Sequence, residues 1–402
     1  MSVRTDYRHT IYASYIGYVT QAVVNNLPTL LFLTFRDSFG IPLSKITLLI
    51  TFNFVTQLLV DAASAKFVDR IGYRASVLAA HLFAAAGLCG MATLPFLLPD
   101  PFAGLLLSAV LYAVGGGLTE VLISPIVEAC PTDNKAGVMS LLHSFYCWGT
   151  VGVILLATAF LNLVGAEHWR LLCILFALIP LGNTVYFSFV PIVRLTEEGE
   201  NMKIGEILRS GLFWLFIALM AASGASEQAM VQWASAFAES GLGVTKTVGD
   251  LIGPCLFSVL MGGARVFYAK MSGRIDLVNF LIGSGALCIG TYFLASLSSS
   301  PAVSLLACAF CGLTVGILWP GVFSVASAAF RKGGTALFAL LALAGDLGCA
   351  GGPTTVGFLS GLFGEDLKKG LVFGAVFPAF LVLCALIFKK RTRKKNGRKA
   401  EN

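Results

Sequence analysis

The sequence consists largely of apolar runs that are long enough to cross a lipid bilayer. A membrane-spanning α-helix needs about 20 predominantly apolar residues, because the hydrocarbon core is about 30 Å thick. Runs of this length lie near residues 11–35, 43–67, 75–97, 102–127, 137–164, 169–193, 212–238, 248–269, 277–299, 301–329, 334–363 and 370–388. We therefore predict an all-α integral membrane protein with twelve transmembrane helices.

The composition indicates that much of the surface of the protein faces lipid and not water. Of the 402 residues, 57% are apolar and only 12% are charged, whereas soluble domains carry roughly 25% charged residues. Nine of the ten cysteines lie within apolar runs, and Cys308 and Cys311, which have two residues between them, have no second ligand pair nearby. We therefore interpret the cysteines as small buried side chains. The first ten residues are polar, which predicts that the first run is a span and not a signal peptide.

No motif for enzymatic chemistry is present in the sequence. It contains no phosphate-binding Walker loop, no nucleophile elbow and no zinc-ligand spacing. We therefore predict no catalytic residues, no metal and no cofactor, and we expect a proton gradient to be the energy source.

The distribution of basic residues predicts the orientation. Most of the 28 Lys and Arg residues lie at the two termini and in the even-numbered gaps between runs. Because cytoplasmic loops are enriched in Lys and Arg, we predict cytoplasmic termini in the plasma (inner) membrane. The basic tail, residues 389–402, is predicted to lie near anionic lipid headgroups and not to bind nucleic acid.

A polar segment at 194–211 divides the chain into two six-helix bundles, 1–193 and 212–388. The fourth run contains Gly117-Leu-Thr-Glu-Val-Leu-Ile-Ser-Pro125, and the tenth contains Gly312-Leu-Thr-Val-Gly-Ile-Leu-Trp-Pro320. Chance could repeat Gly-Leu-Thr in so apolar a chain, but the shared proline at the same spacing favours duplication. Repeated halves are how many transporters achieve alternating access.

The gap between the second and third runs reads Ala65-Lys-Phe-Val-Asp69-Arg70-Ile-Gly72-Tyr-Arg74. It resembles the signature loop of the major facilitator superfamily, and the second half carries a degraded copy near Lys270. This resemblance implies two pseudo-symmetric six-helix bundles. A cytoplasmic gate is predicted from Asp61, Asp69, Arg70 and Arg74.

Further motifs resemble the fucose-permease branch of that superfamily, which are sugar/proton symporters. They are Asn25-Asn26-Leu27, Gly117-Leu-Thr-Glu120 with Ser124-Pro125, and Leu142-His143-Ser144-Phe145. The archetype of this branch has an acidic residue shortly after its Asn-Asn-Leu, where this chain has Pro28-Thr29-Leu30. One proton carrier of the branch is therefore absent.

Four carboxylates lie well inside the apolar runs: Asp61, Glu120, Glu227 and Asp346; Asp250 lies at the edge of another run. A charged group in a span costs about 2.5–3.5 kcal/mol on insertion scales, so each is a functional candidate. Glu120, Glu227 and Asp346 are the predicted proton-coupling residues. The alternatives are a structural hydrogen bond for Glu120 and a hinge contact for Asp346.

Planar amides, carboxylates and aromatic rings in the spans have the chemistry that binds sugars. The predicted substrate-binding residues are Gln21, Asn25, Asn26, Glu120, His143, Glu227, Gln228, Trp233 and Trp319. Any one of them could instead form a hydrogen bond between helices worth about 0.6 kcal/mol.

These observations predict a secondary active transporter whose partners are a small-molecule substrate, protons and the lipid bilayer. The preferred function is proton-coupled uptake of a sugar or similar polar metabolite by a monomer. Two alternatives stay open. One is proton-antiport efflux of amphipathic compounds, favoured by the missing first-span acid. The other is a non-transporting receptor with a transporter fold.

Overall fold

The computed structural model describes residues 3–193, 195, 202–236, 251–364 and 366–400, apart from a few side chains within its helices. The chain forms two compact units. Unit 1 comprises Met1–Asp133, Phe145–Asn201 and Gly334–Leu340, and unit 2 comprises Asn134–Ser144, Met202–Gly333 and Leu341–Asn402. Parts of the predicted linker (196–201) and of the predicted spans (237–238 and 248–250) lie outside the described residues.

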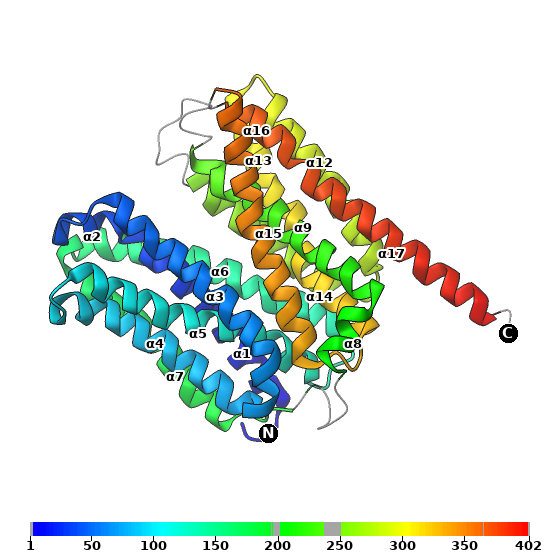
Figure 1. Ribbon diagram of the computed structural model, residues 1–402, viewed down its shortest axis with the longest axis horizontal. Helices are drawn as coiled ribbons and strands as arrows, with labels where there is room; N and C mark the ends of the chain where they lie inside the picture. The colour runs from blue at the N-terminus through cyan, green and yellow to red at the C-terminus, as the bar shows by residue number, and fades with distance from the viewer. Residues whose placement is uncertain (1–2, 194, 196–201, 237–250, 365, 401–402) are drawn as a thin grey trace. The chain divides into compact units, whose positions relative to one another are not determined.

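Helices account for the regular structure throughout the described ranges, as predicted (Figure 1). Unit 1 contains α1 (Tyr7–Leu30), α2 (Phe32–Phe39), α3 (Leu43–Ile71), α4 (Tyr73–Leu97), α5 (Pro101–Ala129), the 3₁₀ turn η1 (Ala166–His168) and α7 (Trp169–Phe189). Unit 2 contains α8 (Ile204–Arg209), α9 (Gly211–Ala236), the π-helical turn η3 (Leu251–Cys255), α11 (Leu256–Met271), α12 (Leu277–Leu297), α13 (Pro301–Val315), α14 (Leu318–Ala329), α16 (Leu367–Gly374) and α17 (Val376–Ala400). Residues of α6 (Lys135–Leu163) and α15 (Gly334–Leu362) contribute to both units.

Aspartates begin several of these helices. The side chains of Asp6, Asp100, Asp276 and Asp366 accept hydrogen bonds from backbone N–H groups in the first turns of α1, α5, α12 and α16. These N–H groups have no partner within their own helix, and a negative charge near a helix N-terminus is favourable. Short polar gaps therefore fix where the apolar helices start.

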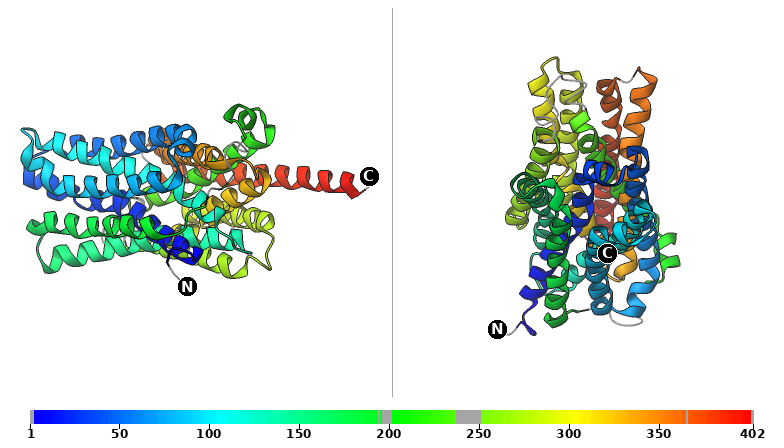
Figure 2. Two further views of the ribbon diagram at one scale, coloured as in Figure 1. Left: turned by 90° about the horizontal axis from the view of Figure 1, so that it is seen from below. Right: turned by 90° about the vertical axis from the view of Figure 1, so that its left-hand side faces the viewer.

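Three of the predicted runs are interrupted near a proline. The tenth is divided into α13 and α14 just before Pro320, and the twelfth into α16 and α17 just before Pro378. Proline has no N–H and its ring clashes with the preceding turn, which accounts for these two breaks. The first run is divided into α1 and α2 at Leu31, three residues after Pro28, which itself lies inside α1. Beyond its break, α17 continues as one helix to the basic tail (Figure 2).

Gly72 makes the reversal between α3 and α4. Its φ of +91° lies in the region that favours glycine, and its N–H donates to the carbonyl of Val68 at the end of α3. Gly72 therefore allows a tight reversal between α3 and α4.

The helices of the two units have matching neighbours. In unit 1, α5 packs against α1, α3 and α4, and α7 packs against α1 and α4. In unit 2, α13 packs against α9, α11 and α12, and α17 packs against α9 and α12. Because these helices occupy corresponding places in the two halves of the sequence, the packing agrees with the predicted duplication.

Small residues bring these helices close together. A Cβ at Gly117 of α5 would lie 3.1 Å from Val60 Cβ of α3. A Cβ at Gly312, the corresponding position in α13, would lie 2.9 Å from the backbone carbonyl carbon of Phe257 at the start of α11. Close approach at small residues is typical of helix packing in membranes, where there is little hydrophobic driving force between helices.

Ten helices in the described ranges are long and apolar enough to cross a membrane. Neither α1 nor α11 is among them. The sequence of α1 is rich in polar residues, and α11 has 16 residues and follows a π-helical turn. Large apolar side chains such as Leu59, Leu156 and Leu163 are exposed on the protein, as expected for helices that face lipid.

Candidate functional site

The polar residues of unit 1 gather where α1, α3 and α5 meet. Gln21 of α1 donates from Nε2 to Oε2 of Glu120 on α5, at 3.0 Å. Gln57 of α3 donates from the same Nε2 to Oδ1 of Asn25 at 3.0 Å and to Oδ1 of Asn53 at 3.1 Å. Three of the predicted substrate-binding residues, Gln21, Asn25 and Glu120, thus belong to one polar cluster. We call these five residues the amide cluster.

Helical periodicity and one glycine create this cluster. Asn53, Gln57 and Asp61 follow one another at intervals of four on one buried face of α3. On α5, a Cβ at Gly116 would lie 3.3 Å from Gln21 Oε1 and 3.4 Å from Gln57 Nε2. Glycine therefore leaves room on α5 for the side chains of α1 and α3.

Asn26 points away from the amide cluster. Its Nδ2 donates to the backbone carbonyl of Ala22 at 2.8 Å and to Oγ1 of Thr150 on α6 at 3.3 Å. Thr29, at the place of the missing acid, is exposed and donates to the carbonyl of Asn26. The two adjacent asparagines therefore have different partners, although the sequence predicts the same role for both.

Asp69, Arg70 and Arg74 of the predicted gate lie near the junction of α3 and α4, whereas Asp61 lies more than two turns before the end of α3. Arg74 donates from Nη1 to the carbonyls of Phe187 and Ser188, at 2.8 and 2.9 Å, and from Nη2 to that of Val190 at 2.8 Å. A cation is favourable at a helix C-terminus, and α7 ends at this point. Arg70 is exposed and Asp61 is buried, while the side chain of Asp69 lies outside the described residues.

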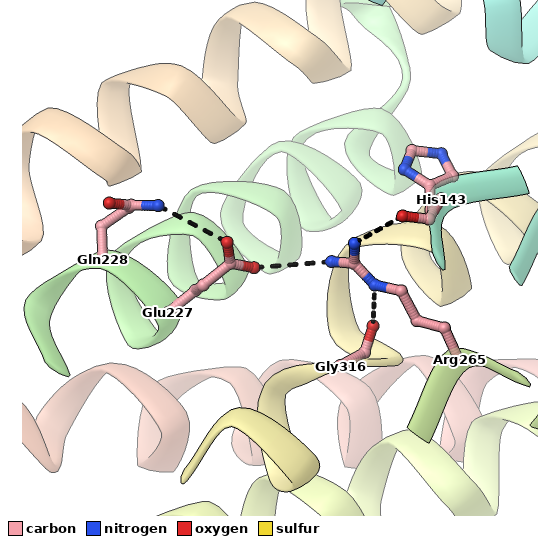
Figure 3. Close-up of polar contacts among 5 residues, drawn as sticks. All are labelled: His143, Glu227, Gln228, Arg265 and Gly316. Atoms are coloured by element: carbon pink, nitrogen blue, oxygen red, sulfur yellow. Dashed lines mark hydrogen bonds and ion pairs between the residues drawn. The ribbon is translucent and has the colours of Figure 1, made fainter. Parts of the chain in front are cut away.

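In unit 2, an ion pair joins α9 to α11 (Figure 3). Arg265 Nη2 lies 3.6 Å from Oε2 of Glu227, and the two side chains are 4% and 12% exposed. Arg265 also donates from Nε to the carbonyl of Gly316 at 2.8 Å and from Nη1 to that of His143 at 2.9 Å. Gln228 Nε2 lies 3.5 Å from Glu227 Oε1. Glu227 is therefore held by a buried cation.

Pro320 explains why the Gly316 carbonyl can accept from Arg265. In an α-helix, this carbonyl would accept from the N–H of the residue four positions later. That residue is Pro320, which has no N–H. The proline shared by the two repeated motifs thus leaves a carbonyl for the guanidinium. A second contact fixes Arg265, because Ser140 of α6 donates to its backbone carbonyl at 2.7 Å.

The predicted aromatic residues of unit 2 are packed within the helices. The His143 ring lies 5.9 Å from that of Phe323, which in turn lies 6.1 Å from that of Trp319. Trp319 is 8% exposed and packs on Gly345, next to the half-buried Asp346 of α15. Trp233 donates from Nε1 to the carbonyl of Pro353 at 2.9 Å. Of the predicted residues, Glu227 and Gln228 contribute side chains to the ion pair, and His143 contributes its backbone carbonyl.

Sequence reasoning missed Gln57, Asn53 and Arg265. The polar residues at 53, 57 and 61, spaced at four within an apolar run, were a usable signal for the first two. Arg265 is a cation inside a span, the same signal that singled out the four carboxylates.

The sequence matches that of a known family over residues 14–353. The chain belongs to the Major Facilitator Superfamily. The predicted superfamily and its two-bundle, all-α fold are thereby confirmed, and the chain is a multi-pass membrane transporter and not an enzyme.

Individual relatives support the same fold. "Membrane protein MosC" of Rhizobium meliloti is 25% identical over 349 residues, covering 84% of this chain and 82% of MosC. The structure of the superfamily transporter FucP in its outward conformation has a TM-score of 0.80 and 13% identity, with 94% of this chain and 98% of FucP covered. Another crystal structure describes FucP as the E. coli fucose:proton symporter. The proton:xylose symporter XylE has a TM-score of 0.74 and 14% identity, with 95% of both chains covered.

Proposed function

We propose that this chain takes up an uncharged, sugar-like solute together with protons by alternating access. It would act as a monomer in the plasma (inner) membrane with both termini in the cytoplasm. Two known symporters with the same fold, FucP and XylE, support this proposal, because their names give fucose and xylose as substrates and the proton as the coupling ion. The amide cluster supports a polyhydroxylated substrate, since amides both donate and accept hydrogen bonds as hydroxyls do.

The buried ion pair between Glu227 and Arg265 is the observation that carries the coupling proposal. Protonation of Glu227 would remove a negative charge that lies beside Arg265. The guanidinium cannot lose its own proton, and removing a counter-charge from a buried cation is unfavourable. Protonation of Glu227 would therefore favour a rearrangement around α9 and α11, and such a link is what proton coupling requires.

Glu120 provides the second proposed coupling site, in unit 1. Its hydrogen bond from Gln21 places a carboxylate within the amide cluster. A substrate that binds at the cluster would change the surroundings of Glu120, and proton binding there would in turn change substrate affinity. Asp346, on α15, is the third proposed site.

The test is uptake of labelled fucose, xylose and glucose by the purified protein in proteoliposomes. We expect at least one of them to accumulate when the outside is more acidic than the lumen. The variants Glu120→Gln and Glu227→Gln should still allow exchange of labelled for unlabelled sugar, but should lose accumulation against a gradient. Undiminished accumulation by both variants would contradict the proposed roles.

The second candidate function is proton-antiport efflux of amphipathic compounds. The absence of a carboxylate at Thr29 favours it, because the sugar-symporter branch has an acid near this position. Export of a lipophilic dye from cells that express the protein, without uptake of any sugar of the panel, would support efflux over symport.

A further inference from the structure

Gln57 connects two asparagines through both hydrogens of its amide nitrogen. Its Nε2 donates to Oδ1 of Asn25 on α1 and to Oδ1 of Asn53, one turn earlier on α3. Gln57 is 3% exposed and Asn53 is 7% exposed, whereas Asn25 is half-buried. A solute could therefore reach Asn25 but not the two residues behind it.

The hydrogen bonds determine which end of the Asn25 amide is available. A primary amide has one oxygen that accepts and one nitrogen that donates. The oxygen of Asn25 already accepts from Gln57, so the nitrogen is the end left for a solute. Gln57 cannot turn without losing both of its hydrogen bonds, because Asn53 holds the second hydrogen. The orientation of Asn25 is thus fixed from behind.

We propose that Gln57 is a positioning residue that determines substrate specificity, because it makes Asn25 a hydrogen-bond donor to a hydroxyl oxygen of the substrate. This inference rests on the proposed function and adds α3 to the substrate site. It assigns the substrate to solutes that present an accepting oxygen to Asn25, such as the hydroxyl of a sugar. An ammonium group has only donors and could not occupy this position.

The competing explanation is that Gln57 only holds α1 and α3 together. The two roles have different consequences for binding. A residue that only joins helices would affect all ligands to the same extent when it is replaced. A residue that orients Asn25 would change the relative affinities of ligands that differ at one hydroxyl group, because the donor that recognises this hydroxyl would be lost.

The experiment uses the full-length purified protein and whichever of fucose, xylose and glucose stabilises it most against thermal unfolding. The dissociation constant is measured for this sugar and for its deoxy and deoxyfluoro derivatives at each carbon. Fluorine accepts a hydrogen bond weakly and cannot donate one, so it tests for a donor on the protein. For the wild-type protein, we expect that removal of the hydroxyl at one carbon of the sugar weakens binding on the order of ten-fold. Fluorine at this carbon should restore part of the lost affinity.

The variant Gln57→Leu should bind the parent sugar about ten-fold more weakly. The deoxyfluoro derivative should no longer bind more tightly than the deoxy derivative. In Gln57→Glu, the introduced carboxylate accepts from Asn25 Nδ2 and turns its oxygen towards the substrate. The derivative with fluorine at the same carbon should then bind more weakly than the parent sugar, and this difference in affinity should be larger than in the wild-type protein. The control is Asn162→Leu, at an exposed amide of α6, which should keep the wild-type pattern.

Two results would overturn the inference while leaving the proposed function intact. One is that Gln57→Leu binds the sugar derivatives with the same relative affinities as the wild-type protein. The other is that both Gln57 variants fail to fold, which would make the residue structural. If the wild-type protein binds no sugar of the panel, the proposed function itself is wrong, and the inference is wrong with it.

Discussion

At the residue scale, the charge of Arg265 determines how the ion pair responds to substitution. Glu227→Gln removes a counter-ion of the buried guanidinium, and breaking a buried pair in this way costs about 3–5 kcal/mol. Arg265→Met should cost less, because a carboxyl group can neutralise itself by binding a proton whereas a guanidinium cannot. The double variant should be more stable than Glu227→Gln alone. Thermal unfolding in detergent measures these differences, and additive losses in the double variant would show that the two residues are not coupled.

The sequence identifies some candidate functional residues but not the atoms through which they make contact. Glu120 and Glu227 could be singled out because carboxylates are rare in apolar runs. The atoms that form their contacts could not be predicted. His143 was expected to act through its ring, yet its backbone carbonyl accepts from Arg265. Such contacts depend on how each helix is rotated about its axis, which side-chain periodicity specifies only approximately.

At the scale of the helix, glycine positions decide how closely neighbours pack. A Cβ at Gly115 of α5 would lie 2.6 Å from the backbone carbonyl oxygen of Ala80 on α4, which cannot move aside as a side chain can. Gly115→Ala should therefore lower stability by about 1–3 kcal/mol and the melting temperature with it. Gly152→Ala on α6 is the matched control, because nothing lies within 4 Å of the added carbon. Equal melting temperatures for the two variants would contradict the packing described for α4 and α5.

Helix existence could be predicted from the sequence better than helix continuity. Twelve apolar runs predicted the main helices, because length and hydropathy alone determine whether a segment can span lipid. The runs at 11–35, 301–329 and 370–388 are each interrupted, and Pro28, Pro320 and Pro378 lie near the breaks. Proline can also lie within an unbroken helix, as Pro125 does in α5. A proline therefore marks a possible break, and the packing around it decides the outcome.

At the scale of the whole molecule, membership of the Major Facilitator Superfamily establishes a transporter, and the basic residues predict its orientation. With both termini in the cytoplasm, a fluorescent protein fused to Asn402 should be fluorescent, and alkaline phosphatase fused there should be inactive. Fusions to a gap between the first and second spans should behave in the opposite way. Active phosphatase at the C-terminus would reverse the proposed topology.

The central claim, that solute and proton move together, is tested most directly by the pH outside proteoliposomes that contain the purified protein. Fucose, xylose and glucose are added in turn without any imposed gradient. We predict that at least one sugar makes the outside more alkaline as protons enter with it, and that Glu120→Gln abolishes this change. Sugar entry with no change in external pH, in the wild-type protein, would contradict the account.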